Sequence, residues 1–271
     1  MILASDLDRT LIYSKRFINE KINIKSELVL IEKKEDIEIS YITKTSIELL
    51  KKIIENIIFI PATTRTVEQY QRISLAKENI IPKYAIVSNG GNILENGKLN
   101  EEWNDTIKNQ LNKNSTNYED VKRKFSEISN KNWLLRSYTA DNLFLYYIVD
   151  QEKIPMDKIY DFEIWLKENR WTLSMQGRKL YLIPDCVDKW KAINFICEKE
   201  NDYEVIAAGD SLLDLKMLNK SKYAISPSHG EIKSRVFRGK KEQNSIVFTK
   251  RSGFYAADDI MLEIIDYIKK V

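Results

Sequence analysis

Short, uninterrupted runs of apolar residues recur along the chain and alternate with longer, more polar stretches. The clearest runs cover residues 2–4, 57–60, 84–87, 205–208 and 223–225, the last of which we expect to continue as a strand to Ser226. A short apolar run bounded by turn residues is typical of a strand buried on both faces, as in a parallel sheet. A helical pattern begins near Thr43, with apolar positions on one face at 47, 50, 53 and 54. This alternation predicts an α/β fold built on a doubly wound, Rossmann-like parallel sheet.

The middle of the chain follows a different pattern. A polar helical stretch from about 104 to 129 is followed by strands at 133–137 and 143–149, a helix at 156–168, and strands at 171–175 and 179–183. This order, in which each of two helices is followed by two strands, predicts an α+β domain with an open sheet covered by two helices. We therefore expect a core domain from residues 1–90 and 185–271, with residues 91–184 inserted as a second domain.

Polar and charged residues stand where the predicted core strands end or a helix begins. Asp6 and Asp8 follow the first run, and further such residues follow in chain order: Thr63, Lys189, Asp210 and Asp214. Ligands of open α/β sheets bind at the carboxyl ends of the strands, so we expect these side chains to meet there. Two carboxylates two residues apart can place a nucleophile beside a proton donor.

Each of these residues also has a simpler interpretation. An acid or a threonine at such a position can act only as a helix N-cap, as Asp188 does in the predicted helix that begins at Lys189. Thr64 competes with Thr63 for the same role, and Lys191 competes with Lys189 from a position deeper in the helix.

Taken together, the motifs resemble those of phosphatases of the haloacid dehalogenase (HAD) superfamily. The chain has D-x-D-x-T at 6–10, a threonine-bearing second motif, a lone lysine, and G-D-x-x-x-D at 209–214. The inserted domain resembles the large type-two cap of the Cof-like branch. That branch includes sucrose-phosphate and mannosyl-3-phosphoglycerate phosphatases and phosphomannomutases.

The resemblance implies a set of roles. Asp6 would be the nucleophile that forms an aspartyl-phosphate, and Asp8 would protonate the departing alkoxide and later deprotonate water. Thr63 and Lys189 would bind the phosphoryl oxygens. Mg²⁺ would be held by the side chains of Asp6 and Asp210 and the main-chain carbonyl of Asp8, and Asp214 would hold the metal or its waters from nearby.

The resemblance also implies residues that bind substrate or order the phosphate loop: Thr10, Thr64, Arg65, Asn89, Gly90 and Arg178. Arg178 follows Gly177 in a Gly-Arg pair and would face the leaving group. It could equally be an edge charge that discourages strand pairing. Thr64 stands where relatives often have glycine, and Leu213 stands where many Cof-like members have asparagine.

Composition narrows the possible partners. The 43 basic and 40 acidic residues give a net charge of +3, which does not indicate a nucleic-acid binder. Two cysteines are too few for a disulfide framework, and no apolar run approaches the length of a membrane span. The single histidine, His229, excludes a histidine-based metal cluster; it either contacts substrate or lies solvated in a loop. We expect a cytoplasmic monomer or homodimer that binds a small phosphorylated metabolite.

Residues 27–42 predict a β-hairpin between the first motif and the first long helix. It could gate the site, pair with another subunit, or simply decorate an edge.

The function that we expect is Mg²⁺-dependent hydrolysis of a small phosphomonoester, such as a sugar phosphate. The alternatives are a sugar phosphomutase, a nucleotide or cofactor phosphatase, and a regulatory binding protein with a degenerate site.

Overall fold

The computed structural model describes residues 1–17, 27–237 and 246–271. Five parallel strands form the central sheet, in the spatial order β15 (Val247–Phe248), β14 (Tyr223–Ser226), β13 (Val205–Ala208), β1 (Ile2–Ser5), β5 (Ile58–Pro61). A parallel bridge from Ala62 to Ile86 then leads to an antiparallel sheet of β6 (Tyr84–Val87), β7 (Asn92–Glu95) and β8 (Lys98–Leu99). The predicted α/β fold is confirmed.

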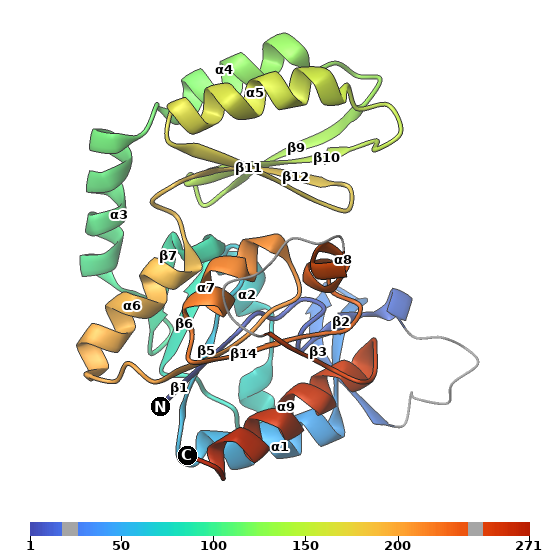
Figure 1. Cartoon of the computed structure of the whole chain (residues 1–271), viewed down its shortest axis with the longest axis vertical. Helices are drawn as coiled ribbons and strands as arrows, with labels where there is room; N and C mark the ends of the chain where they lie inside the picture. The colour runs from blue at the N-terminus through green and yellow to red at the C-terminus, as the bar shows by residue number, and fades with distance from the viewer. Residues whose placement is uncertain (18–26, 238–245) are drawn as a thin grey trace.

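Helices cover both faces of this sheet because successive residues of a buried strand point to opposite sides. Ile2 and Ala4 of β1 pack in one buried cluster with residues of α6 (Lys189–Glu200) and α7 (Leu215–Lys220). Leu3 packs in the other, with residues of α1 (Lys44–Ile54) and α9 (Phe254–Ile268). Figure 1 shows α1 and α9 together beneath the sheet, with α6 on its other side. The carboxyl ends of β1, β5 and β13 therefore stay open between these layers.

The inserted domain is a four-stranded antiparallel sheet with helices on one face. Its strand order is β11 (Trp171–Gln176), β12 (Lys179–Pro184), β10 (Phe144–Val149), β9 (Leu134–Ala140). The helices α4 (Tyr118–Ile128) and α5 (Met156–Glu168) cover the face that points away from the core (Figure 1). The other face of the sheet is turned toward the core.

The prediction of one helix over 104–129 is wrong. The structure has two helices there, α3 (Glu101–Asn114) and α4, separated by three residues. Ser115 is extended, and the Asn117 side chain accepts a hydrogen bond from Asp120 N and starts the second helix. An N-cap inside a polar stretch ends one helix and begins another without changing the hydrophobic pattern.

The first part of the insertion stays attached to the core. Strand β7 pairs with β6 along its length, and Trp103 of α3 packs against Phe195 of α6 at a ring distance of 5.2 Å. We propose that residues 91–184 form the cap domain, with β7, β8 and α3 as its anchored stem.

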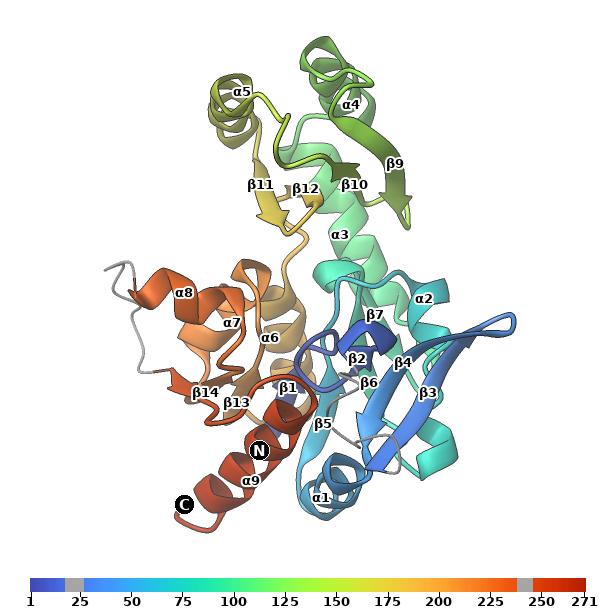
Figure 2. The same ribbon diagram turned by 90° about the vertical axis from the view of Figure 1, so that its right-hand side faces the viewer.

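The predicted hairpin near residues 27–42 is present. Strands β3 (Leu28–Lys34) and β4 (Ile37–Thr43) pair with each other, and β4 also pairs with β2 (Tyr13–Ser14), which follows the first motif. Figure 2 shows the hairpin beside the core, below α2 (Val67–Gln71). The remaining helix, α8 (Glu231–Phe237), follows β14. No helix among the described residues is both long and apolar enough to cross a membrane.

Candidate active site

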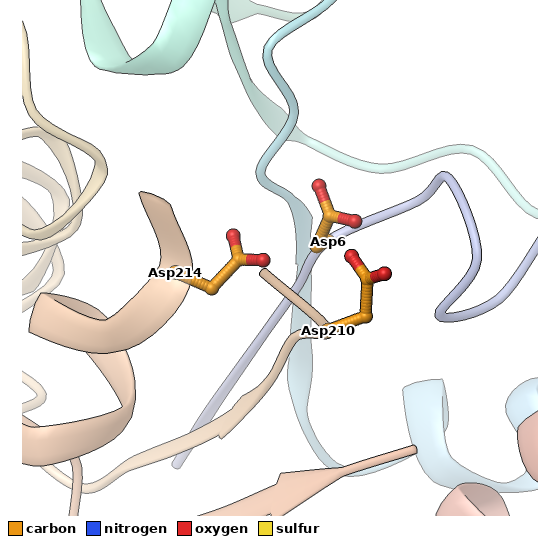
Figure 3. A group of neighbouring side chains, drawn as sticks. All are labelled: Asp6, Asp210 and Asp214. Atoms are coloured by element: carbon orange, nitrogen blue, oxygen red, sulfur yellow. The ribbon is translucent and has the colours of Figure 1, made fainter. Parts of the chain in front are cut away.

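Three buried carboxylates meet at the carboxyl ends of β1 and β13. Asp6, Asp210 and Asp214 each place an oxygen within 4.8 Å of the others (Figure 3). Gly209 allows the turn after β13 to close, because a Cβ there would lie 2.5 Å from the Cβ of Asp214. The spacing G-D-x-x-x-D thus has a steric reason: the glycine makes room for the second aspartate.

Lys189 is a buried cation within this cluster. Its Nζ lies 2.8 Å from Asp6 Oδ1 and 2.6 Å from Asp214 Oδ1, and its side chain is 1% exposed. Burial lowers the pKa of Lys189, but the two carboxylates outweigh that effect and raise it above its usual range. The Asp188 side chain accepts hydrogen bonds from Trp190 N and Lys191 N, which fixes Lys189 as the first residue of α6. Lys189 therefore remains charged.

Lys189, together with Arg9, whose Nε lies 3.3 Å from Asp210 Oδ2, does not fully compensate three buried acids. Burial, together with Asp214 and Asp8, raises the pKa of Asp6 to about 7 against the pull of Lys189. Burial and the neighbouring carboxylates raise the pKa of Asp210 well above its usual value. A bound cation would stabilise the deprotonated form of these carboxylates.

The donor set fits Mg²⁺, which prefers hard oxygen ligands. We propose the side chains of Asp6 and Asp210 as ligands, with the main-chain carbonyl of Asp8. Asp214 lies beside these ligands: its Oδ1 accepts from Lys189, and its Oδ2 accepts from Ser211 N and Oγ at 3.0 and 2.8 Å. In this arrangement Asp214 orients Lys189 and the turn that carries Asp210.

Asp8 lies beside the cluster and is held by Arg65. Arg65 Nε and Nη2 contact the two oxygens of Asp8 at 2.7 and 2.8 Å, a bidentate pair. Burial alone would raise the pKa of Asp8, but the Arg65 guanidinium holds it below its usual range. Arg65, a residue of the second motif, therefore pairs with Asp8 of the first motif.

The threonines occupy three different positions. Thr10 is buried and its Oγ1 donates to Asp6 Oδ2 at 3.3 Å. Thr63 is also buried, and its Oγ1 accepts from Arg65 N at 3.2 Å, while no described residue accepts its hydroxyl proton, so that this proton can be donated to a ligand. Thr64 lines the cleft above the carboxylates. The two candidates of the second motif are therefore distinct in position.

Asn89 and Gly90 are brought to the start of α6. The Asn89 side chain donates to the carbonyl of Val187 at 3.3 Å. A Cβ at Gly90 would lie 2.3 Å from the carbonyl oxygen of Asp188, so only glycine fits there. These residues support the placement of Lys189, and their predicted contact with substrate stays a prediction.

A cleft of about 760 Å³ lies between the core and the cap sheet. Arg178 lines it, as do four side chains of the cap face that sequence reasoning missed: Tyr146, Gln176, Lys179 and Tyr181. Tyr181 pairs with Tyr146 across the strands. Tyr181 and Asp8 raise the pKa of Lys179, which marks how near its ammonium lies to the first motif.

A signal for two of these residues was present in the sequence. In β12, Lys179 and Tyr181 alternate with Leu180 and Leu182, which pack under the cap helices. Alternation of this kind assigns Lys179 and Tyr181 to the face opposite the helices. Arg178 precedes the strand and lies in the turn beside Gly177.

His229 joins the first motif to the turn before α9. Its Nδ1 accepts from Gly253 N at 3.2 Å, so the ring proton lies on Nε2, which donates to the carbonyl of Arg9 at 3.1 Å. Burial lowers the pKa of His229, which favours this neutral form. Arg9 Nε in turn lies 3.3 Å from Asp210 Oδ2. His229 thus supports the loop that carries Asp8.

A family model and several solved structures match the chain. A family model described as sucrose-6F-phosphate phosphohydrolase matches residues 1–257. No curated protein sequence matches the chain. Among solved structures, sucrose-phosphatase from Synechocystis sp. PCC6803, determined in complex with sucrose and phosphate, is 16% identical with a TM-score of 0.71. The match covers 99% of this chain and 98% of that one.

Two further structures share the fold. A haloacid dehalogenase-like hydrolase from Bacillus subtilis is 17% identical, with a TM-score of 0.55, over 97% of this chain and 91% of that one. A HAD/COF-like hydrolase from Plasmodium vivax is 16% identical, with a TM-score of 0.58, over 97% and 95%. The parallel core and its inserted cap are thus a shared architecture.

Proposed function

Because the chain belongs to the sucrose-6F-phosphate phosphohydrolase family, in the Cof-like branch of the HAD superfamily, and is a phosphoric monoester hydrolase, we propose that it hydrolyses a sugar phosphate with Mg²⁺ through an aspartyl-phosphate on Asp6. The observation that carries this proposal is the placement of Asp6 between Lys189 and Asp8 at the open sheet edge, beneath the cap.

In the first step a carboxylate oxygen of Asp6 attacks phosphorus, and the bond from phosphorus to the sugar oxygen breaks. The proton of Asp8 passes to that oxygen, and the sugar leaves as an alcohol. In the second step water attacks the phosphorus of the aspartyl-phosphate and gives its proton to Asp8, and the bond from phosphorus to the Asp6 oxygen breaks. Inorganic phosphate leaves, and both aspartates return to their starting forms.

The Arg65–Asp8 pair suits the second step directly, because it holds Asp8 as the carboxylate that accepts a proton. The first step needs Asp8 protonated. A phosphate dianion that binds beside Asp8 raises the proton affinity of this carboxylate by charge repulsion. Substrate binding and protonation of Asp8 are therefore coupled in this proposal.

Beyond these proton transfers, phosphoryl transfer is accelerated mainly by positioning of the reactants and neutralisation of their charge. Lys189 offsets the approach of an anionic substrate to Asp6, and the Thr63 hydroxyl donates to a phosphoryl oxygen. When bound, Mg²⁺ supplies further positive charge and orients the phosphoryl oxygens.

The cap face favours a polyhydroxylated leaving group. Three tyrosines run across it: the rings of Tyr138 and Tyr146 stack at 4.9 Å, and those of Tyr146 and Tyr181 lie 5.8 Å apart. The Gln176 Nε2 is buried beside them without a hydrogen-bond partner among the described residues. Aromatic surfaces with hydroxyls and a free amide donor suit a sugar, which has apolar faces and many oxygens.

The test is release of inorganic phosphate from a panel that includes sucrose 6F-phosphate, trehalose 6-phosphate, hexose phosphates, nucleotides and 3-phosphoglycerate. It compares Mg²⁺ with chelator for the wild type, for Asp6→Asn, and for Asp36→Asn, an exposed aspartate of the hairpin, as control. We expect metal-dependent release from sugar phosphates that disappears in Asp6→Asn alone.

Two results would contradict the proposal. Isomerisation of a sugar phosphate without net phosphate release would indicate a mutase. Equal release by the wild type and Asp6→Asn would exclude Asp6 as nucleophile.

A further inference from the structure

The hairpin carries a buried carboxylate that the reaction described above does not use. Glu32 of β3 is 2% exposed, and its Oε2 lies 2.8 Å from Arg65 Nη1 and accepts from Ser40 Oγ at 2.7 Å. Its Oε1 lies 3.5 Å from Arg72 Nε. A buried carboxylate is costly unless it is paired. Glu32 therefore pairs with two arginines, Arg65 of the second motif and Arg72 at the end of α2.

Arg65 is shared between Glu32 and Asp8. Its Nε and Nη2 contact Asp8, while Nη1 contacts Glu32. A guanidinium is planar and presents its donors in a fixed fork, so an anchor at Nη1 sets the direction in which Nε and Nη2 point. The orientation of the Asp8 carboxylate is thus linked through Arg65 to a residue of the hairpin.

Ser40 of β4 strengthens the same link. Its hydroxyl donates to Glu32 and accepts from Arg65 Nη2 at 3.3 Å. Both strands of the hairpin thus contact the guanidinium. Burial works against the charge of Arg65, but Asp8 and Glu32 outweigh it and raise the pKa of this arginine, so the link persists across the working pH range.

We propose that Glu32 is a positioning residue for leaving-group protonation: it holds Arg65 so that Asp8 is directed at the oxygen of the departing group. This inference rests on the proposed function, in which Asp8 is the proton donor. It assigns the hairpin to the catalytic apparatus, as the support of the Arg65–Asp8 pair.

The test compares two kinds of phosphate ester. An alkyl ester needs a proton on its leaving oxygen, whereas p-nitrophenyl phosphate releases a weakly basic phenolate that needs little protonation. The alkyl ester is the sugar phosphate that the wild type turns over fastest in the panel. The measured quantity is the ratio of kcat/KM for the alkyl ester to kcat/KM for p-nitrophenyl phosphate, because kcat/KM reports on the step in which the sugar leaves.

We expect Glu32→Gln to lower this ratio about tenfold. A general acid that is no longer well directed should lose part of the rate acceleration that general acids typically contribute. Ser40→Ala should lower it less, in the same direction, and serves as the milder variant if Glu32→Gln folds poorly. The matched control is Glu38→Gln on the same hairpin, whose side chain is exposed and bonds to Tyr41 and Lys15 instead. Its ratio should equal that of the wild type.

A hairpin that only stabilises the fold would lower activity toward both esters by the same factor. An unchanged ratio in both Glu32→Gln and Ser40→Ala, with wild-type hydrolysis of both esters intact, overturns the inference and leaves the proposed function standing. If the wild type hydrolyses no alkyl phosphate, the proposed function fails and the inference fails with it.

Discussion

Lys189 and Asp214 form a buried ion pair in which Nζ lies 2.6 Å from Oδ1. The same ammonium contacts Asp6, so one cation joins the predicted nucleophile to the end of the fourth motif. Removal of one member of a buried pair leaves the other charges uncompensated. Lys189 therefore matters for the charge of the whole cluster as well as for phosphate binding.

From this relationship we predict that Lys189→Met lowers kcat by about 100-fold or more, as the loss of a preorganised charge at a reacting group does. The control is Lys191→Met. Lys191 is exposed and its Nζ donates to the carbonyl of Asp185 at 2.9 Å, so its loss should change kcat less than about threefold. Steady-state kinetics on the same sugar phosphate measure both, and equal losses would contradict the assignment of the third motif to Lys189.

The raised pKa values of the acid cluster predict a pH-dependent response to Mg²⁺. In the metal-free protein the pKa of Asp6 is raised from 3.8 to about 7. The folded state then binds more protons than the unfolded state between these values, so the free energy of unfolding falls as the pH rises through this window. Mg²⁺ binds the deprotonated carboxylates and therefore competes with protons.

We accordingly expect the gain in Tm on addition of Mg²⁺ to be small at pH 5 and larger at pH 8. Differential scanning fluorimetry at matched ionic strength measures it. In Asp210→Asn the gain should be reduced at both pH values, because that variant lacks a proposed ligand whose pKa is also raised. A gain in Tm that does not change with pH in the wild type would show that the cluster is not the metal site.

Substitution of the two threonines of the second motif should have different effects on the kinetics. Thr63→Val removes a buried hydroxyl whose proton can be donated to a ligand, so we expect kcat/KM to fall about tenfold or more. Thr64→Val changes a residue of the cleft wall and should alter KM more than kcat. Kinetics of the two variants on one substrate distinguish them, and the reverse order would assign the phosphate contact to Thr64.

The sequence was sufficient to predict those parts of the fold in which local pattern and burial agree. The buried strand β1 begins with an apolar run at residues 2–4, and Asp6 follows the strand directly, so both the strand and the position of the carboxylate could be inferred. The cap strands β10, β11 and β12 were also predicted near their positions, whereas β9, which is exposed at five of its seven positions, extends three residues beyond the predicted strand at 133–137. The boundary between α3 and α4 was missed because an N-cap asparagine in a polar stretch leaves the periodicity unchanged.

Residues that act through long-range contacts could not be inferred. Glu32 lies 33 positions before Arg65, and nothing in the hairpin's alternation shows that this particular carboxylate turns inward. Only the packing of the hairpin beside the second motif brings the two together. His229 is similar: its partners, Arg9 and Gly253, come from loops that are distant in sequence.

The turn between β9 and β10 docks the cap onto the core. Asp141 Oδ2 accepts hydrogen bonds from Ser88 Oγ, from Val67 N at 3.0 Å and from Asn92 Nδ2 at 3.3 Å. Val67 begins α2, directly after the second motif. One cap carboxylate therefore ties the cap sheet to the loop that carries Thr64 and Arg65.

We predict that Asp141→Ala raises KM for the sugar phosphate about tenfold, because loss of hydrogen bonds worth about 1 kcal/mol each loosens the cap above the cleft. The kcat for p-nitrophenyl phosphate, which uses the cap little, should change less than about twofold. Asp141→Asn keeps one acceptor oxygen and should recover part of the lost affinity. The control, Asp161→Ala, removes an exposed aspartate of α5 and should behave as the wild type. An equal loss on both substrates would mean that Asp141 stabilises the whole protein rather than the position of the cap.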